Sequence, residues 1–218
     1  MADTQHPALY AHFDRERWRG VDLLIGCGDL PGEYLDFLAT SLGVPFLYVR
    51  GNHDTRQRGG PQGVGENIDG RLVMYKGLRI LGFEGSAWYG GRGIEYTQRA
   101  MAWRVWSTFP RLLVAGRPDI VVTHAPPALR PGEVTGVEMP AMVLDVGAKH
   151  AAHEDPAPGP DDPAHKGFAA FTSLIALFAP QLWLHGHAHL TYSRARRVHK
   201  YRDTLIANAY EYLLLDIA

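Results

Sequence analysis

The sequence predicts a mixed α/β fold, and three observations support this prediction. Apolar runs of strand length alternate with longer runs that have helical spacing. One helical run lies between two strand-like runs, which is the order of a βαβ unit with parallel strands. Two other strand-like runs are separated only by Lys76 and Gly77, as in an antiparallel hairpin. At 218 residues the chain is long enough for one substantial core, so we expect a single domain.

The first half of the chain contains the βαβ unit and the hairpin. The predicted elements are a strand at 21–27, a helix at 32–42, a strand at 44–49, a glycine-rich loop at 55–70 and hairpin strands at 71–75 and 78–83. The spacing of Tyr34, Leu35 and Leu38 supports the helix. Gly43 follows it directly and is expected to be its C-terminal cap.

The second half begins with helical spacing at 97–115. Pro110 removes a backbone donor inside this run, so we expect either one kinked helix or two short ones. The later predicted elements are a strand at 119–123, a helix from 165 that ends before Pro180, a strand at 181–185 and three short strands after 189, the last two at 204–208 and 212–217. A long loop insertion is expected at 126–163, either a functional lid or a disordered segment, with a short helix at 139–152.

Side chains that bind metal ions follow four of the predicted strands. They are Asp29 after Gly28, the run Asn52, His53 and Asp54 after Gly51, His124 after Thr123, and His187 and His189 around Ala188. In open α/β sheets, ligands bind outside the carboxyl ends of the strands. We therefore expect these residues to converge at one edge of one sheet, although they are far apart in the sequence.

These four groups, in this order and each at a strand end, resemble the motifs of the calcineurin-like metallophosphoesterase superfamily. The resemblance extends over nearly the whole chain, from Asp3 to Asp216. It implies a four-layer α/β/β/α sandwich with mixed sheets. It also implies hydrolysis of a phosphomonoester or phosphodiester by a metal-activated hydroxide at a dinuclear site. The same chemistry cleaves nucleic acids and cyclic nucleotides, so nuclease activity stays open.

The resemblance assigns ligands for two divalent metal ions. Asp29 is the candidate bridge, because a shared carboxylate reduces the repulsion between two ions that lie close together. Asn52, His124 and His187 would hold one ion, and Asp3 and His189 would hold the other. An amide oxygen and imidazole nitrogens suit Mn²⁺, Fe²⁺ or Zn²⁺ better than Ca²⁺, and Mn²⁺ is the expected metal.

Four more residues receive roles in catalysis or substrate binding. By resemblance, His53 lies beside the leaving-group oxygen, where an imidazolium stabilises developing negative charge or donates a proton. Asp54 either orients His53 or caps the segment that follows it. Arg56 either contacts a phosphate oxygen or is solvated in its glycine-rich loop. His165 either reaches the substrate or belongs to a mobile insertion.

The sequence departs from the family pattern at its start. The usual first motif is an aspartate, any residue and a histidine, but here Asp3 and Thr4 are followed by Gln5. Only two residues precede Asp3, so the first strand is missing from this chain as given. Either upstream residues normally supply that strand, which we favour and which would make the given chain less stable, or the first metal site is weakened. A catalytically weakened or inactive metal-binding regulatory module is therefore the alternative function.

Composition and charge indicate which classes of partner are not expected to bind and which compartment is expected. The formal net charge is −1, which gives no general attraction to nucleic acids or to anionic membranes. The basic stretch at 194–202 is expected to be a solvated hairpin. Cys27 is the single cysteine and cannot form an intrachain disulfide, and no apolar span of membrane length is present. We therefore expect a cytoplasmic protein. The resemblance implies that its partner is a phosphate-ester substrate.

Overall fold

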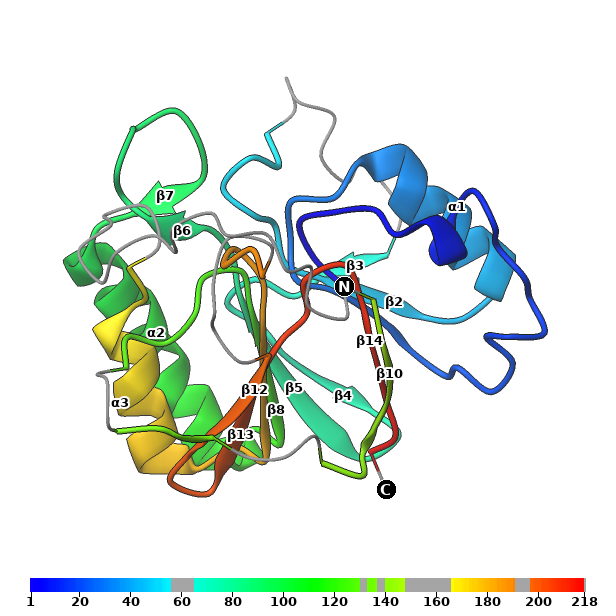
Figure 1. Cartoon of the computed structure of the whole chain (residues 1–218). Coiled ribbons are helices and arrows are strands. Elements are labelled where there is room, and N and C mark those ends of the chain that lie inside the picture. The colour runs from blue at the N-terminus through cyan, green and yellow to red at the C-terminus, as the bar shows by residue number, and fades with distance from the viewer. Residues whose placement is uncertain (56–64, 130–132, 137–139, 148–165, 191–196, 218) are drawn as a thin grey trace.

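The computed structural model describes residues 1–55, 65–129, 133–136, 140–147, 166–190 and 197–217. They form a mixed α/β fold with several sheets, which confirms the predicted fold class (Figure 1). The helices are the 3-10 helix η1 (Pro7–Leu9), α1 (Gly32–Leu42), α2 (Gln98–Ala115) and α3 (Ala169–Phe178). None of these described helices combines the length and the apolar character that crossing a membrane requires.

The main sheet contains seven of the described strands. They are, in spatial order, β4 (Leu72–Tyr75), β5 (Leu78–Phe83), β8 (Ile120–Thr123), β11 (Leu182–His185), β13 (Thr204–Asn208), β12 (Val198–Tyr201) and β9 (Thr135–Gly136). The four strands from β5 to β13 are parallel, whereas β4 and β12 pair antiparallel with their neighbours. The predicted hairpin is confirmed, and its turn residues Lys76 and Gly77 have φ values of 45° and 86°.

Three smaller sheets accompany the main sheet in the described residues. They consist of β1 (Leu24–Gly26), β2 (Phe46–Tyr48) and β3 (Glu66–Asn67), of β10 (Val143–Val146) and β14 (Leu213–Leu215), and of β6 (Ser86–Ala87) and β7 (Glu95–Tyr96). α1 connects the parallel strands β1 and β2, as predicted for the βαβ unit.

The first three residues run beside β1 and place Asp3. The backbone N–H of Cys27 donates to the carbonyl of Met1 at 2.8 Å, and the N–H of Asp3 donates to the carbonyl of Gly28 at 3.1 Å. Ala2 forms an isolated parallel bridge with Tyr210. Asp3 is therefore held between the end of β1 and the segment before β14, although no strand precedes β1 among the described residues.

Three apolar cores separate four layers. α2 and α3 pack on one face of the main sheet, where Trp183 of β11 is fully buried. Side chains alternate along a strand, so Leu182 and Leu184 point to the opposite face and pack against the smaller sheets. In β2, Leu47 joins this second core, whereas Phe46 packs with α1 in the third. The order of layers is therefore α2 with α3, the main sheet, the two small sheets of β1–β3 and of β10 with β14, and α1, which is the predicted α/β/β/α sandwich (Figure 1).

The helix α2 continues through Pro110 as one helix. The sequence predicts either one kinked helix or two short helices here. Met101 and Val105 before the proline and Leu112 after it are all buried. Their packing against the main sheet outweighs the single backbone hydrogen bond that proline removes, because tertiary packing supplies most of the stability of a helix in a protein.

The predicted helix at 139–152 is wrong in its described part. Val143–Val146 form β10, which pairs antiparallel with the C-terminal strand β14. The β-branched valines at both ends of this segment favour an extended backbone. Pairing with a partner that is remote in the sequence therefore decides the conformation here.

Arg197 in the basic stretch is buried rather than solvated, which corrects part of that expectation. It is 5% exposed, and its Nη1 atom donates to the carbonyls of Asn208 and Tyr210 at 3.1 and 2.9 Å. In the rest of the described stretch, Val198–Tyr201 form β12, which pairs antiparallel with β13 beyond the stretch. Arg197 thus anchors the segment that follows β13.

Candidate metal centre

The loops that carry the predicted ligands meet between two sheets. Asp29 and Asn52 follow β1 and β2 of the three-stranded sheet, whereas His124, His187 and His189 follow β8 and β11 of the main sheet. The expectation that one edge of one sheet provides all of them is therefore wrong. The loops still meet because the two sheets pack face to face through the second apolar core.

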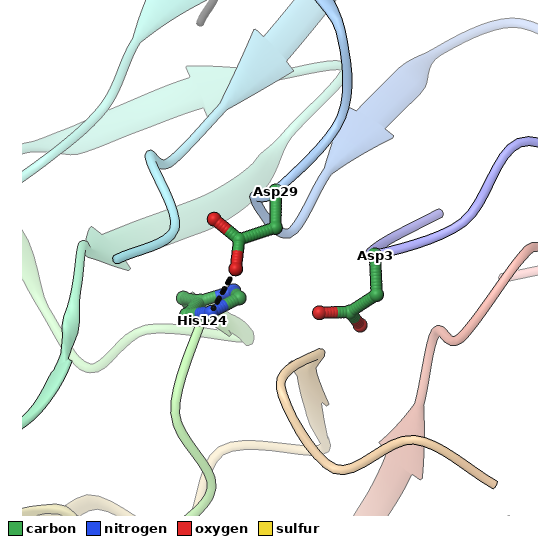
Figure 2. Close-up of side chains that lie close together, drawn as sticks. All are labelled: Asp3, Asp29 and His124. Atoms are coloured by element: carbon green, nitrogen blue, oxygen red, sulfur yellow. Dashed lines mark ion pairs between the residues drawn. The ribbon is translucent and has the colours of Figure 1, made fainter. Parts of the chain in front are cut away.

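One ring nitrogen of His124 contacts both Asn52 and Asp29. Nε2 of His124 lies 3.0 Å from Oδ1 of Asn52 and 3.2 Å from Oδ2 of Asp29. On the other side of the ring, Nδ1 donates to the carbonyl oxygen of Cys27 at 2.8 Å. Figure 2 shows the Asp29 carboxylate directed at the imidazole. An imidazole that donates one N–H to a carbonyl and turns its other nitrogen to the site has the arrangement typical of a metal ligand.

These distances fit a bound cation. Two ligand atoms that each lie about 2.1 Å from one ion, at angles between roughly 90° and 110°, are about 3.0–3.4 Å apart. Both distances from Nε2 of His124 fall in this range. Among the described residues, Asp3, Asp29 and His124 also form a group whose ligand atoms lie within 4.8 Å of one another. Two carboxylates, an amide oxygen and an imidazole suit a first-row divalent metal.

Asp3 links the histidines that follow β11 to this group. Its side chain is 1% exposed, and Figure 2 shows its carboxylate turned towards Asp29 and His124. Both of its carboxylate oxygens accept the backbone N–H of His187 at 3.0 Å. Nε2 of His189 lies 3.7 Å from Oδ1 of Asp3, and the ring centroid of His187 lies 4.9 Å from that of His124. The structure thus brings all six predicted ligands together, while their roles stay predictions.

Three glycines allow the loops to approach this closely. A Cβ atom on Gly51 would overlap the Asp29 carboxylate, and one on Gly28 would overlap the backbone of Gly51 and the ring of His124. A Cβ atom on Gly186 would overlap Ala2. The glycines of the three motifs therefore have a steric purpose, which is to let the ligand-bearing loops touch.

Three of the predicted ligands have a left-handed backbone conformation. The φ angle is 65° at Asp3, 57° at Asp29 and 66° at His187. Such a conformation costs a non-glycine residue about 1–2 kcal/mol. Backbone strain of this kind clusters at functional sites, where the surrounding structure holds it in place. The strain at three neighbouring positions supports the hypothesis that they are shaped for a ligand.

His124 and Asp29 shift each other's pKa. Burial alone would lower the pKa of His124, but the negative charge of Asp29 and its hydrogen bond raise it to about 9. Burial alone would raise the pKa of Asp29, but the positive charge of His124 and its hydrogen bond lower it to about 2. At neutral pH the two residues therefore form an ion pair, and a cation that binds both must displace the imidazole proton.

Asp54 ties together the loops after β1 and β2. Its Oδ2 atom accepts hydrogen bonds from the backbone N–H groups of Gly51 and Asp29, both at 2.8 Å. Burial raises the pKa of the Asp54 carboxyl to about 6. Both donors precede Asp54 in the sequence, so these contacts differ from the predicted cap of the following segment. The proposed action of Asp54 on His53 stays a prediction.

His53 is exposed at the edge of the ligand group. Its backbone N–H donates to Oδ1 of Asp29 at 2.8 Å, and its Nε2 lies 3.2 Å from Nδ2 of Asn52. The side chain thus combines contact with a predicted ligand and access to solvent. Both are needed for its predicted role beside a leaving group, which no contact in the described residues tests.

Two predicted substrate-binding residues and the first motif remain. Arg56 and His165 lie outside the described residues, so their roles stay predictions. Gln5, at the histidine position of the first motif, is exposed. The neighbouring His6 is the N-cap of η1, since its Nδ1 accepts the backbone N–H of Ala8 at 3.2 Å. The first motif thus contributes Asp3 to the described group.

Sequence reasoning missed Tyr89, whose hydroxyl accepts a hydrogen bond from Nδ2 of Asn52 at 3.0 Å. It lies in the glycine-rich segment between β6 and β7, far from every ligand motif. A single exposed tyrosine in such a segment has no periodicity and no motif spacing, so the sequence contains no signal for this contact. Tertiary structure alone brings Tyr89 to Asn52.

Comparisons with known proteins bear on the family and on the fold. The profile of the calcineurin-like phosphoesterase family matches residues 2–190. The crystal structure of TT1561 of Thermus thermophilus is similar, with a TM-score of 0.57 and 13% identity over 96% of this chain and 88% of that one. A second crystal structure has a TM-score of 0.45 and 16% identity, and the match covers 82% of this chain and 63% of that one. No curated protein matches the sequence.

Proposed function

The chain belongs to the calcineurin-like phosphoesterase family, and from this membership we propose that it hydrolyses phosphomonoesters or phosphodiesters at a centre of two divalent metal ions. Family membership supports metal-dependent phosphoester hydrolysis in general. The observation that best supports a metal centre is the convergence of Asp3, Asp29 and His124, with ligand atoms within 4.8 Å of one another. Asn52, 3.0 Å from His124, adds a neutral oxygen to this set.

Each of the two proposed ions would have its own ligands, and one further ligand would bind both ions. Asn52, His124 and His187 would hold one ion, Asp3 and His189 would hold the other, and Asp29 would bridge them. When bound, such ions neutralise charge on the phosphoryl group and lower the pKa of the attacking water. We propose Mn²⁺, with Fe²⁺ and Zn²⁺ as alternatives that suit the same ligands.

The residues of the chain prepare this chemistry in three ways. The carbonyl of Cys27 accepts the Nδ1 proton of His124 and so leaves Nε2 for the metal. Asp54 holds the backbone of Asp29, whose carboxylate stays beside His124. His53, exposed next to Asn52, is the proposed donor of a proton to the leaving oxygen.

Turnover of two synthetic substrates tests the proposal. The protein would be stripped of metal, reloaded with Mn²⁺ and assayed with bis(p-nitrophenyl) phosphate and p-nitrophenyl phosphate. We expect hydrolysis of at least one of them that requires Mn²⁺ and falls by about 10²–10⁴-fold in His53→Ala. His12→Ala is the matched control, because His12 is an exposed histidine in the segment after η1.

The alternative function is a catalytically weakened or inactive metal-binding regulatory module. The exposed Gln5 at the histidine position of the first motif is the observation that favours it. A protein that binds Mn²⁺ tightly and hydrolyses neither substrate would support this alternative. A protein that binds no Mn²⁺ would contradict both functions.

A further inference from the structure

Asn52 is held at two points by the segment 88–94, which we call the Asn52 clamp. The hydroxyl of Tyr89 lies 3.0 Å from Nδ2 of the Asn52 side chain. The backbone N–H of Ile94 donates to the carbonyl of Asn52 at 3.0 Å. A Cβ atom on Gly93 would overlap that same carbonyl, so glycine is needed where the clamp meets Asn52. The clamp therefore fixes both the backbone and the side chain of a predicted metal ligand.

The shape of the clamp is fixed by one carboxylate. Oε2 of Glu95 accepts the backbone N–H groups of Tyr89, Gly90 and Gly91 at 3.0, 3.0 and 2.8 Å. Three hydrogen bonds from consecutive amides to one oxygen define a tight turn. Tyr89 is thus held by the backbone of its own turn, although its side chain is partly exposed.

An asparagine that binds a cation needs a partner for its NH₂ group. The oxygen and nitrogen of the carboxamide have nearly the same shape, and only the oxygen can bind a cation. In Asn52, Oδ1 faces Nε2 of His124, while Nδ2 faces the hydroxyl of Tyr89 and lies 3.2 Å from Nε2 of His53. Nδ2 thus donates one hydrogen to the Tyr89 hydroxyl, and it can donate the other to Nε2 of His53 in the tautomer that leaves this nitrogen without a proton.

We propose that Tyr89 is a positioning residue for the metal centre. It holds the Asn52 carboxamide with its oxygen towards the ion and, through the same amide group, holds the imidazole of His53 in place. A flipped carboxamide would turn its N–H groups, rather than its oxygen, towards the cation. This inference rests on the proposed function, because it assumes an ion bound by Asn52.

Tyr89→Phe tests the role of the hydroxyl, since it keeps the ring and removes the acceptor. We expect the Mn²⁺ dissociation constant, measured by titration calorimetry, to rise roughly two- to tenfold. In the loaded enzyme kcat should fall while KM stays unchanged. Tyr10→Phe is the matched control, because Tyr10 is a similarly exposed tyrosine that packs on Tyr34 and Phe37. An unchanged dissociation constant in Tyr89→Phe would overturn the proposal.

A double-mutant cycle separates positioning from a general structural role. Asn52→Ala removes the group through which Tyr89 is proposed to act. We therefore expect Tyr89→Phe to have no further effect on Mn²⁺ affinity in the Asn52→Ala background. Equal effects of Tyr89→Phe in both backgrounds would mean that Tyr89 supports the fold rather than the amide, and would overturn the proposal.

Nuclear magnetic resonance provides a readout that needs no metal. The side-chain amide signals of Asn52, identified by their absence in Asn52→Ala, should shift in Tyr89→Phe and stay in place in Tyr10→Phe. Signals that do not move in Tyr89→Phe would overturn the proposal. A shift in a protein that binds no Mn²⁺ would support the contact between Tyr89 and Asn52 and contradict the metal-dependent function, so the two failures are distinguishable.

Discussion

His124 and Asp29 form an ion pair across the junction of two sheets, with Nε2 of the imidazole 3.2 Å from Oδ2 of the carboxylate. His124 follows β8 of the main sheet, and Asp29 follows β1 of the three-stranded sheet. The charge of each residue shifts the pKa of the other, so both are ionised at neutral pH. In the proposed metal centre, this pairing makes metal binding depend on pH and on the packing of the two sheets.

Mn²⁺ affinity should increase with pH up to about 9. The pKa of His124 is raised to about 9, so below that pH an ion that binds Nε2 displaces one proton. The apparent dissociation constant should then fall about tenfold for each pH unit, which calorimetric titrations at several pH values would measure. An affinity that is constant between about pH 6 and 8 would contradict binding at Nε2 of His124.

Removal of metal should lower the melting temperature. At an Mn²⁺ concentration about 100 times the dissociation constant, binding stabilises the folded state by about 2.7 kcal/mol, which corresponds to roughly 5–10 °C for a chain of this size. Thermal unfolding with Mn²⁺ and with a chelator would measure the difference. Asp29→Asn should show little or none of this shift, whereas the exposed Asp22→Asn should keep it in full.

Asp54→Asn and Asp54→Ala should differ in stability. The pKa of Asp54 is raised from 3.8 to about 6, so its contribution to folding is fully present below about pH 4 and is lost as the pH rises through 6. Asparagine keeps an oxygen acceptor for Gly51 and Asp29 without the buried charge. In the metal-free protein at about pH 8, Asp54→Asn should therefore be at least as stable as the native chain, while Asp54→Ala should lose about 1–3 kcal/mol.

Urea unfolding at several pH values would measure these differences. The advantage of Asp54→Asn over the native chain should disappear as the pH falls below about 4, since Asp54 is then neutral in both the folded and the unfolded state. An Asp54→Ala variant as stable as the native chain would contradict the idea that this carboxyl holds the two loops.

Gly51→Ala should reduce metal affinity more than stability. Its new Cβ atom would overlap the Asp29 carboxylate and displace a predicted bridging ligand. We expect Mn²⁺ to bind at least about tenfold more weakly, because misplacing one charged ligand costs more than about 1.4 kcal/mol. Gly20→Ala is the control, since Gly20 lies outside the ligand loops and the Asn52 clamp and its Cβ atom would meet nothing within 4 Å. Equal affinities for the two variants would contradict the steric role of Gly51.

Local sequence patterns predicted most of the elements. The helix at 32–42 and its cap Gly43 are reproduced, because apolar spacing and a glycine in the left-handed conformation are local signals. The helix predicted at 139–152 is wrong in its described part, because Val143–Val146 form a strand that pairs with β14, which is remote in the sequence. Which strands share a sheet was mispredicted for the same reason, since pairing is decided by contacts between distant segments.

The candidate site shows the same division between local and tertiary information. Asp29, Asn52 and His124 could be selected because each residue type suits a metal and follows a predicted strand. Tyr89 could not, because its contact with Asn52 depends on a turn whose position only the folded chain defines. The hydrogen bonds of Asp54 to two backbone N–H groups are likewise invisible in a sequence motif.

The division of the ligands between two sheets makes the centre sensitive to aliphatic residues that never contact an ion. Val49, which directly follows β2, and Val122 of β8 are both buried in the core between the two sheets. A smaller side chain there would let the sheets slide by a fraction of an ångström and alter the spacing of ligands whose own identities are intact. Affinity for the ion can thus be tuned from the interior, and weaker metal uptake in a variant does not by itself identify a lost ligand.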